Sequence, residues 1–104
     1  SKARVVFEFL IERFKQSQDG FLSRHAISEL ASDIYAGKLL WKNSSFKASR
    51  RYVYQVIRSL ERMGMIQYRH GKVGGDWRQG YWVEFTAFEK RLLAISSRWR
   101  KLMV

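Results

Sequence analysis

The sequence predicts a small α+β domain with the element order helix, strand, helix, helix, strand, strand, helix. Two observations lead to this prediction. Apolar residues recur with a helical period in four separate stretches. Between the third and fourth stretches, an alternating segment interrupted by glycines predicts a β-hairpin. With 104 residues, of which 46% are hydrophobic, the chain is expected to form a single domain over residues 1–104.

The first helix is expected over Lys2–Gln16, because apolar residues at helical spacing would face the interior. These residues are Val6, Leu10, Ile11 and Phe14. The sequence Ser-Gln-Asp-Gly at 17–20 has turn chemistry and should end the helix. Phe21 and Leu22 are then expected to form a short strand.

The second helix should begin at Ser23 as N-cap and reach about Tyr35, and Gly37 should stop it. Its buried face is expected to comprise Ala26, Ile27, Leu30, Ala31 and Ile34. The following segment, 38–46, contains Leu39, Leu40 and Trp41, which favours a packed loop or an extra helical turn. Either Leu40 and Trp41 fill the core, or the segment brings polar residues to a partner.

The third helix is the centre of the pattern and has an apolar back and a cationic front. Its apolar stripe consists of Val53, Val56, Ile57, Leu60 and Met63. The opposite face carries Lys47, Arg51, Gln55, Arg58 and Arg62. Ser44 or Ser45 is expected to cap the helix, and Gly64 to end it in a left-handed conformation.

The hairpin is predicted from a strand at 65–69, a flexible Gly-rich tip at 70–80 and a second strand at 81–85. Thr86 and Glu89 then have the spacing of a capping box. The last helix should carry apolar residues at helical spacing, namely Phe88, Leu92, Ile95, Trp99 and Leu102.

The charge pattern points to a polyanionic partner. The chain has 20 Lys and Arg against nine Asp and Glu, a net charge of +11 and a pI of about 10.5. Ten of the 20 basic residues fall within 38–80, where Glu61 and Asp76 are the only acids. The excess is therefore concentrated on the third helix, the segment before it and the hairpin, as expected for nucleic-acid binding. A ribosome-like structural role and a solubilising surface are the alternatives.

Several other function classes lack their signatures. The chain has no cysteine, and His25 and His70 have no companions at metal-ligand spacing, so we expect neither a metal nor a cofactor. The Gly-rich segment lacks the Gly-Lys-Ser/Thr ending of a phosphate-binding loop, and no plausible catalytic triad is found; we expect no enzyme. No apolar run is long enough to span a bilayer, which favours a soluble cytoplasmic or nucleoid-associated protein without a membrane partner. Ser1 could follow a removed initiator methionine or mark excision from a longer chain.

The order of these elements resembles the winged helix-turn-helix superfamily over roughly residues 21–93. The matching residues are Leu60, Gly64 and Ile66 at the end of the third helix, with Thr86 between the second wing strand and the closing helix. The resemblance implies that Phe21–Leu22 pair with the hairpin, which is the wing, and that the third helix is a recognition helix. It also implies sequence-specific binding of double-stranded DNA, in transcription regulation or at a replication origin, as in phage and plasmid replication proteins. The connection at 38–46 is longer than the family's.

The expected DNA contacts follow from residue type and placement. Arg can bind guanine and Gln adenine through paired hydrogen bonds in the major groove, whereas wing cations mostly meet phosphates. The candidate residues are Lys42, Ser45, Lys47, Arg50, Arg51, Tyr54, Gln55, Arg58, Arg69, His70, Lys72 and Arg78. The alternative for the helix is a solvated amphipathic face. Tyr54 could reach phosphate or pack, and Trp77 could stack on unpaired bases or fold back on the sheet.

Two further expectations concern partners. The same fold could serve as a protein-interaction or RNA-binding module, because a fold alone does not fix function. The end of the chain is apolar, which predicts a homodimer through the first and last helices. The apolar residues concerned are Trp99, Leu102, Met103 and Val104.

Overall fold

The computed structural model describes residues 1–73, 75–83 and 85–95, except the side chains of residues 73 and 85–87. Over these residues the chain is an α+β domain with four helices and a three-stranded antiparallel sheet of order β1-β3-β2. The elements are α1 (Lys2–Gln16), β1 (Phe21–Ser23), α2 (Arg24–Ala36), α3 (Phe46–Arg62), β2 (Gln67–Val73), β3 (Asp76–Trp82) and α4 (Phe85–Ile95). The predicted element order is confirmed.

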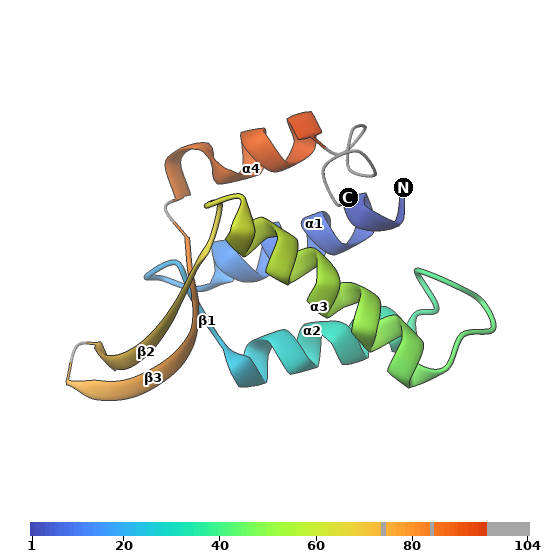
Figure 1. The fold of residues 1–104 in the computed structure, drawn as a ribbon, viewed down its shortest axis with the longest axis horizontal. Helices are drawn as coiled ribbons and strands as arrows, with labels where there is room; N and C mark the ends of the chain where they lie inside the picture. Colours follow the sequence, from blue (N-terminus) through green and yellow to red (C-terminus); the bar gives the residue numbers. More distant parts are fainter. Residues whose placement is uncertain (74, 84, 96–104) are drawn as a thin grey trace.

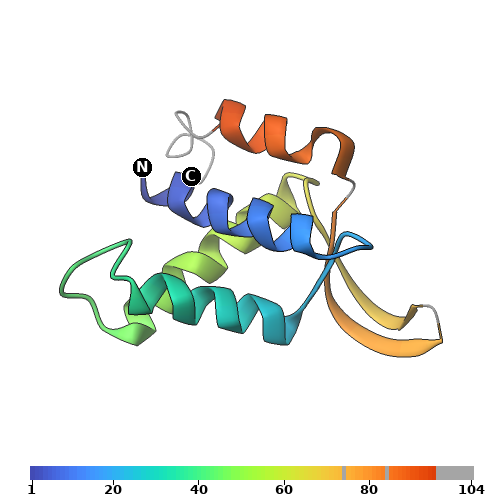
Figure 2. The same cartoon turned by 180° about the vertical axis from the view of Figure 1, so that it is seen from behind.

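The helices pack around one core, and the β2–β3 hairpin projects from one end of the body (Figure 1). Helix α3 crosses in front of α1 and α2, which come to the front when the molecule is turned round (Figure 2). Helix α4 packs on α1, where the rings of Phe14 and Phe88 meet edge to face with centroids 5.2 Å apart. The arrangement leaves the outer side of α3 uncovered.

The predicted apolar faces form this core. On α3, Val53, Val56, Ile57 and Leu60 are all inaccessible to solvent, and Met63 is half-buried. The four predicted inward residues of α1 are buried, as are Ile27, Leu30, Ala31 and Ile34 of α2. Because the apolar side of α3 is buried against the other helices, its cationic side must face solvent.

Strand β1 joins the hairpin to the body. It pairs with β3 through Phe21–Trp82, Leu22–Tyr81 and Ser23–Gly80, as the resemblance implied. A Cβ on Gly80 would lie 2.1 Å from the carbonyl oxygen of Leu22. The close approach of the two backbones therefore requires glycine at this position, and it fixes where the hairpin leaves the domain.

The helix ends largely match the sequence signals. The Ser23 hydroxyl accepts the N–H of Ala26 at 3.1 Å, and the Ser45 hydroxyl accepts that of Ala48 at 3.1 Å, so Ser45 rather than Ser44 caps α3. Gly64 has φ +74 after the end of α3, as predicted. Gly37 ends α2 in a right-handed conformation, and the left-handed residue is Lys38 with φ 51.

The hairpin departs from prediction in its bounds. The expected flexible tip at 70–80 is mostly regular, because the β2–β3 ladder continues to the pair Val73–Asp76. Met65 and Ile66 are buried residues before β2 and not part of it, and β3 ends at Trp82. Helix α4 begins at Phe85, one residue before the predicted start; the side chain of Thr86, and hence the predicted capping box, lies outside the described residues, as do Trp99 and Leu102.

Candidate nucleic-acid interface

The outer face of α3 carries a shallow hollow rimmed by cations. Helix capping by Ser45 starts the helix at Phe46, and the helical period then places the lining residues on one side. The residues that line the hollow are Phe46, Lys47, Arg50, Arg51, Tyr54 and Arg58. The Arg50 guanidinium lies 5.1 Å from the centroid of the Tyr54 ring, which holds this arginine along the helix surface. Gln55 is exposed on the same side of α3 but does not line the hollow.

The cations of α3 differ from those of α1 in their partners. On α1, Arg4 pairs with Glu8, Arg13 with Glu29 and Asp33, and Lys15 with Glu89. Among the described residues, no ion pair includes a cation of α3. The acids that form ion pairs therefore lie mostly on α1 and α2, and the five cations of α3 face a single acid of that helix, Glu61, with which none of them pairs.

A second, deeper cleft separates α3 from the base of the hairpin. It is lined by Arg24 and Ile27 of α2, Tyr54 of α3, and Tyr68 and Tyr81 of the hairpin. The rings of Tyr68 and Tyr81 meet edge to face with centroids 5.5 Å apart. Three phenol rings and one guanidinium thus line a cleft that shares Tyr54 with the hollow on α3.

The environment of the cleft keeps the Tyr81 hydroxyl protonated. Burial raises the pKa of the Tyr81 hydroxyl, and the carboxylate of Glu61 acts in the same direction. The phenol therefore stays protonated at neutral pH and can donate a hydrogen bond to an anion. Arg24 was not predicted as a site residue, because only the tertiary packing of α2 against the hairpin brings it here.

The register of the hairpin separates its cations into two faces. One, the tyrosine face, carries Tyr68, His70, Lys72, Trp77, Gln79 and Tyr81, because residues paired across the ladder point to the same side. The other, the arginine face, carries Gln67, Arg69, Asp76, Arg78 and Trp82. The four candidate residues of the hairpin therefore do not share one surface: His70 and Lys72 face the α3 side, whereas Arg69 and Arg78 face away from it.

The two arginines of the arginine face are held by contacts within the chain. Arg78 donates to the Asp19 carboxylate at 2.6 Å and lies 5.5 Å from the centroid of the Phe21 ring. Arg69 lies 5.4 Å from the centroid of the Trp82 ring and donates to Gln67 at 3.4 Å. Side chains alternate between the two faces along each strand, so this separation can be predicted once the register of β2 against β3 is known.

The segment before α3 combines the two alternatives that its sequence left open. Leu40 is buried in the core, whereas Trp41 is partly exposed, with its ring 5.4 Å from that of Tyr52 and 5.3 Å from the Lys2 ammonium group. Leu39 is exposed, and Lys42 is exposed beside the N-terminus of α3. The alternative in which both Leu40 and Trp41 fill the core is therefore wrong for Trp41, since only Leu40 is buried there.

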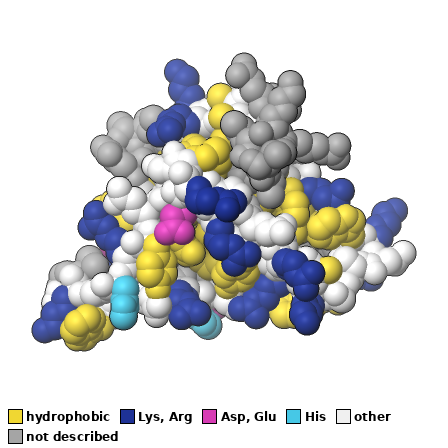
Figure 3. Space-filling model, viewed as in Figure 1, with side chains coloured by type: hydrophobic (Ala, Val, Ile, Leu, Met, Phe, Trp, Pro, Cys, Tyr) yellow, Lys and Arg dark blue, Asp and Glu magenta, His cyan; other side chains and the backbone are white. Residues whose placement is uncertain are grey.

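The face of the molecule that contains α3 is dominated by basic side chains (Figure 3). They extend from the hairpin across α3 toward the segment before it, and acidic side chains are scarce between them. The surface thus combines cations with tyrosines over α2, α3 and the tyrosine face of the hairpin.

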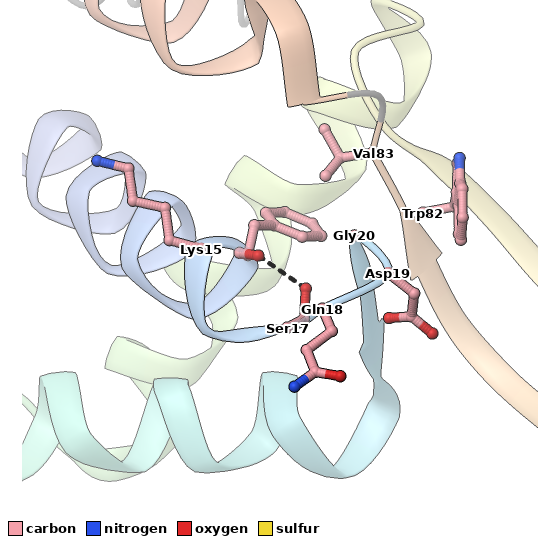
Figure 4. A pocket seen from close by; sticks show the side chains of 8 residues that line it. Lys15, Ser17, Gln18, Asp19, Gly20, Trp82 and Val83 are labelled. Atoms are coloured by element: carbon pink, nitrogen blue, oxygen red, sulfur yellow. Dashed lines mark hydrogen bonds between the residues drawn. The ribbon is translucent and has the colours of Figure 1, made fainter.

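A further hollow lies on the other side of the hairpin, beside the turn at 17–20 (Figure 4). The Ser17 hydroxyl donates to the carbonyl oxygen of Phe14 at 2.7 Å, and Asp19 lies on the same side as Trp82. The lining of this hollow includes neither a histidine nor a cysteine that could serve as a base or nucleophile. Across the described part of the chain, no three His, Cys, Asp or Glu side chains are grouped to hold a metal ion.

Comparisons with known proteins give no further guide. No protein-family model matches the chain, and neither a curated protein nor a solved structure matches it. Among the described helices, none has the length and apolar character to cross a membrane. The function must therefore be inferred from the chemistry of the chain's own surface.

Proposed function

We propose that this chain is a winged-helix domain that binds double-stranded DNA sequence-specifically, with α3 in the major groove and the β2–β3 hairpin as the wing. The element order and the pairing of β1 with β3 are compatible with that layout. An α-helix fits the width of the major groove, and its outward side chains then reach the base edges. The cationic side of α3 is the side left free by the packing of the core.

The observation that carries this proposal is the lack of carboxylate partners for the α3 cations. A cationic helix face that is only solvated would be expected to carry acids at i+3 or i+4, as α1 does with Arg4 and Glu8. Lys47 and Arg51 have no acid at either position, and Arg58, which has Glu61 at i+3, forms no ion pair with it. A polyanion binding here would gain their full charge without first breaking ion pairs.

Within this proposal, some residues contact base edges in the major groove and others contact the phosphate backbone. Arg51 and Gln55 lie at the outward centre of α3 and read base edges, with Arg58 one turn further along. Lys42, Ser45, Lys47, Arg50 and Tyr54 surround the N-terminal half of α3 and meet phosphates. Arg24 and the tyrosine hydroxyls of the cleft hold a phosphate between α3 and the wing, and His70 and Lys72 continue this contact along the backbone.

Arg69 and Arg78 have a weaker claim to contact DNA than His70 and Lys72. They lie on the arginine face, and Arg78 is already paired with Asp19. In the proposed complex they contribute to the field around the wing rather than touch the duplex bound by α3.

The biological setting that fits a domain of this kind is transcription regulation or recognition of a replication origin, in the cytoplasm or on the nucleoid. Pairing of two copies through α1 and α4 remains a prediction, and the apolar residues 99 and 102–104 on which it depends lie outside the described residues. Sedimentation with and without DNA tests it. Only monomers at high protein concentration would exclude the dimer.

Selection of bound fragments from random duplex DNA tests the proposed function. We expect a defined motif, and a palindromic or directly repeated motif would also report two bound copies. The selected duplex, a scrambled duplex, each single strand alone and the matching RNA are then compared at the same salt concentration. Tighter binding of RNA or of the isolated strand than of the selected duplex would overturn the proposal, as would binding to none of these nucleic acids.

A further inference from the structure

The side chain of Trp77, on the hairpin, is exposed to solvent. Trp77 of β3 has a relative exposure of 73%, more than any other large hydrophobic side chain among the described residues. With this exposure the side chain does not fold back on the sheet; Trp77 pairs with Lys72 near the end of the ladder. An exposed indole contributes little to folding, so its surroundings indicate what it could bind.

The surroundings of Trp77 are planar and cationic. The His70 ring lies diagonally across the ladder, with centroids 6.4 Å apart and planes inclined by 53°. Lys72 is exposed opposite Trp77, and Asp76, the nearest acid in sequence, belongs to the arginine face. Hydrophobic, histidine and basic side chains lie together at the end of the hairpin (Figure 3).

The base of the same face is tied to the body. The side-chain NH2 group of Gln79 donates to the Tyr68 hydroxyl, and the Arg24 guanidinium donates to the side-chain oxygen Oε1 of Gln79 at 3.5 Å. Tyr68 in turn packs against Tyr81 in the cleft beside α3. These contacts therefore fix the direction in which the hairpin leaves α3. A ligand that is bound on α3 and follows the tyrosine face would reach Trp77.

We propose that Trp77, with His70 and Lys72, forms a stacking site for an unpaired base, so that the preferred ligand is a DNA duplex with a single-stranded extension. Within a duplex, base faces are covered by their neighbours and only edges are offered to a protein. An exposed indole can stack on a base only where that base is unpaired, and Lys72 then meets the adjoining phosphate. The inference rests on the proposed function, because α3 must hold the duplex while the tip holds the extension.

The test compares one duplex with blunt ends and the same duplex carrying a short single-stranded extension at either 3′ or 5′ end. We expect the wild-type protein to bind one of the extended forms more tightly than the blunt form. Trp77→Ala should weaken binding of that extended duplex by about 5- to 150-fold, the equivalent of ~1–3 kcal/mol per stacked base, and leave the blunt duplex unchanged. Thermal melts verify that the variant is folded.

Two more substitutions distinguish stacking from other contacts. Trp77→Phe keeps an aromatic face and should retain most of the preference, whereas Trp77→Leu keeps apolar character and should behave like Trp77→Ala. Trp41→Ala serves as the matched control, because Trp41 belongs to the segment before α3, at the opposite end of the molecule from the hairpin (Figure 1).

The possible failures can be told apart. Blunt-duplex binding with no gain from either extension, or with equal losses on blunt and extended forms in Trp77→Ala, overturns the stacking site and leaves the proposed function standing. Full activity of Trp77→Leu on the extended duplex would mean that the indole contacts an apolar surface and not a base. Absence of duplex binding by the wild-type protein overturns both proposals.

Discussion

The Arg78 guanidinium lies 2.6 Å from the Asp19 carboxylate, which ties the arginine face of the hairpin to the turn after α1. This contact joins residues 59 positions apart in the sequence. The hairpin is therefore held from two sides, by this ion pair on the arginine face and by the contact from Arg24 to Gln79 on the tyrosine face. Both contacts are polar and partly exposed, so each adds little stability alone.

The Asp19–Arg78 pair predicts a pH dependence of stability. The hydrogen bond from Arg78 lowers the pKa of the Asp19 carboxyl, and the N–H of Phe21, at 3.2 Å, acts in the same direction. Because the pKa is lower in the folded state, the stabilisation is present above the unfolded value of 3.8 and is lost as the pH falls through the folded value. Asp19→Asn should thus lower the free energy of unfolding by about 0.2–1 kcal/mol at neutral pH.

Denaturant melts of both proteins from neutral pH to below 3.8 check this prediction. The difference between them should shrink in acid. The Arg78→Met background is the control, in which Asp19→Asn should have a smaller effect, since the ion pair is lost and the hydrogen bond from the Phe21 N–H remains. A difference that stays constant with pH would contradict the pairing.

The core predicts a sharp contrast on one helix. Leu60 is inaccessible to solvent, so Leu60→Ala should lower the free energy of unfolding by about 2–5 kcal/mol. Arg58 is exposed on the other side of α3, and Arg58→Ala should change it by less than about 0.5 kcal/mol. Equal losses in denaturant melts would mean that the two faces of α3 are assigned wrongly.

The junction of β1 and β3 predicts a steric effect. A Cβ at Gly80 would lie 2.1 Å from the Leu22 carbonyl oxygen and 2.8 Å from the Ser23 Cα. Because backbone atoms cannot move aside as a flexible side chain can, Gly80→Ala should cost about 1–3 kcal/mol or more and displace the hairpin. Loss of the Leu22 and Tyr81 amide protection in hydrogen exchange would report that displacement, because these two residues form the hydrogen-bonded pair of the junction.

Gly37→Ala is the matched control for this change. Gly37 has a right-handed conformation, and the nearest obstacle to a new Cβ is the exposed side chain of Leu39 at 3.1 Å. The free energy of unfolding of the Gly37→Ala variant should therefore stay within about 1 kcal/mol of the wild-type value. Similar losses for both substitutions would show that Gly80 is not sterically special.

The sequence predicts the helices of this fold better than the hairpin. Apolar stripes and serine caps are local patterns, and they identified α1, α2 and α3 because the same residues form the core. The glycines at 71 and 80 predict a flexible tip. Gly80 instead lies in a regular strand, and glycine is needed there because the backbone of β1 passes close to it. No local pattern in the sequence contains that information.

The same limit applies to the candidate interface. The cationic side of α3 could be predicted, since its period is that of the helix. The division of the basic hairpin residues between two faces could not be predicted, because it depends on strand register. The pairing of Arg78 with Asp19 and the placement of Arg24 depend on how distant elements pack. In the sequence Lys72 and Arg78 are therefore equivalent hairpin cations, whereas in the structure they lie on different faces and only Arg78 is paired with Asp19.

That difference makes the last prediction, on DNA binding, a threefold comparison. Arg51 lies at the outward centre of α3, so Arg51→Ala should cost about 1–3 kcal/mol on the selected duplex and relax preference at one base pair. Lys72→Ala should weaken selected and scrambled duplexes alike and lower the salt slope by about one ion. Arg78→Ala should change the slope less than Lys72→Ala does, because the Arg78 charge is already paired with Asp19.

Affinities of the three variants for both duplexes over a salt series measure these effects. If Arg51→Ala and Lys72→Ala gave equal, sequence-independent losses, α3 would not read bases and the domain would be a charge-driven binder. If Arg78→Ala lowered the salt slope as much as Lys72→Ala, DNA would contact the arginine face of the hairpin. The Asp19–Arg78 pair would then have to open on binding, and Asp19→Asn would tighten DNA binding rather than leave it unchanged.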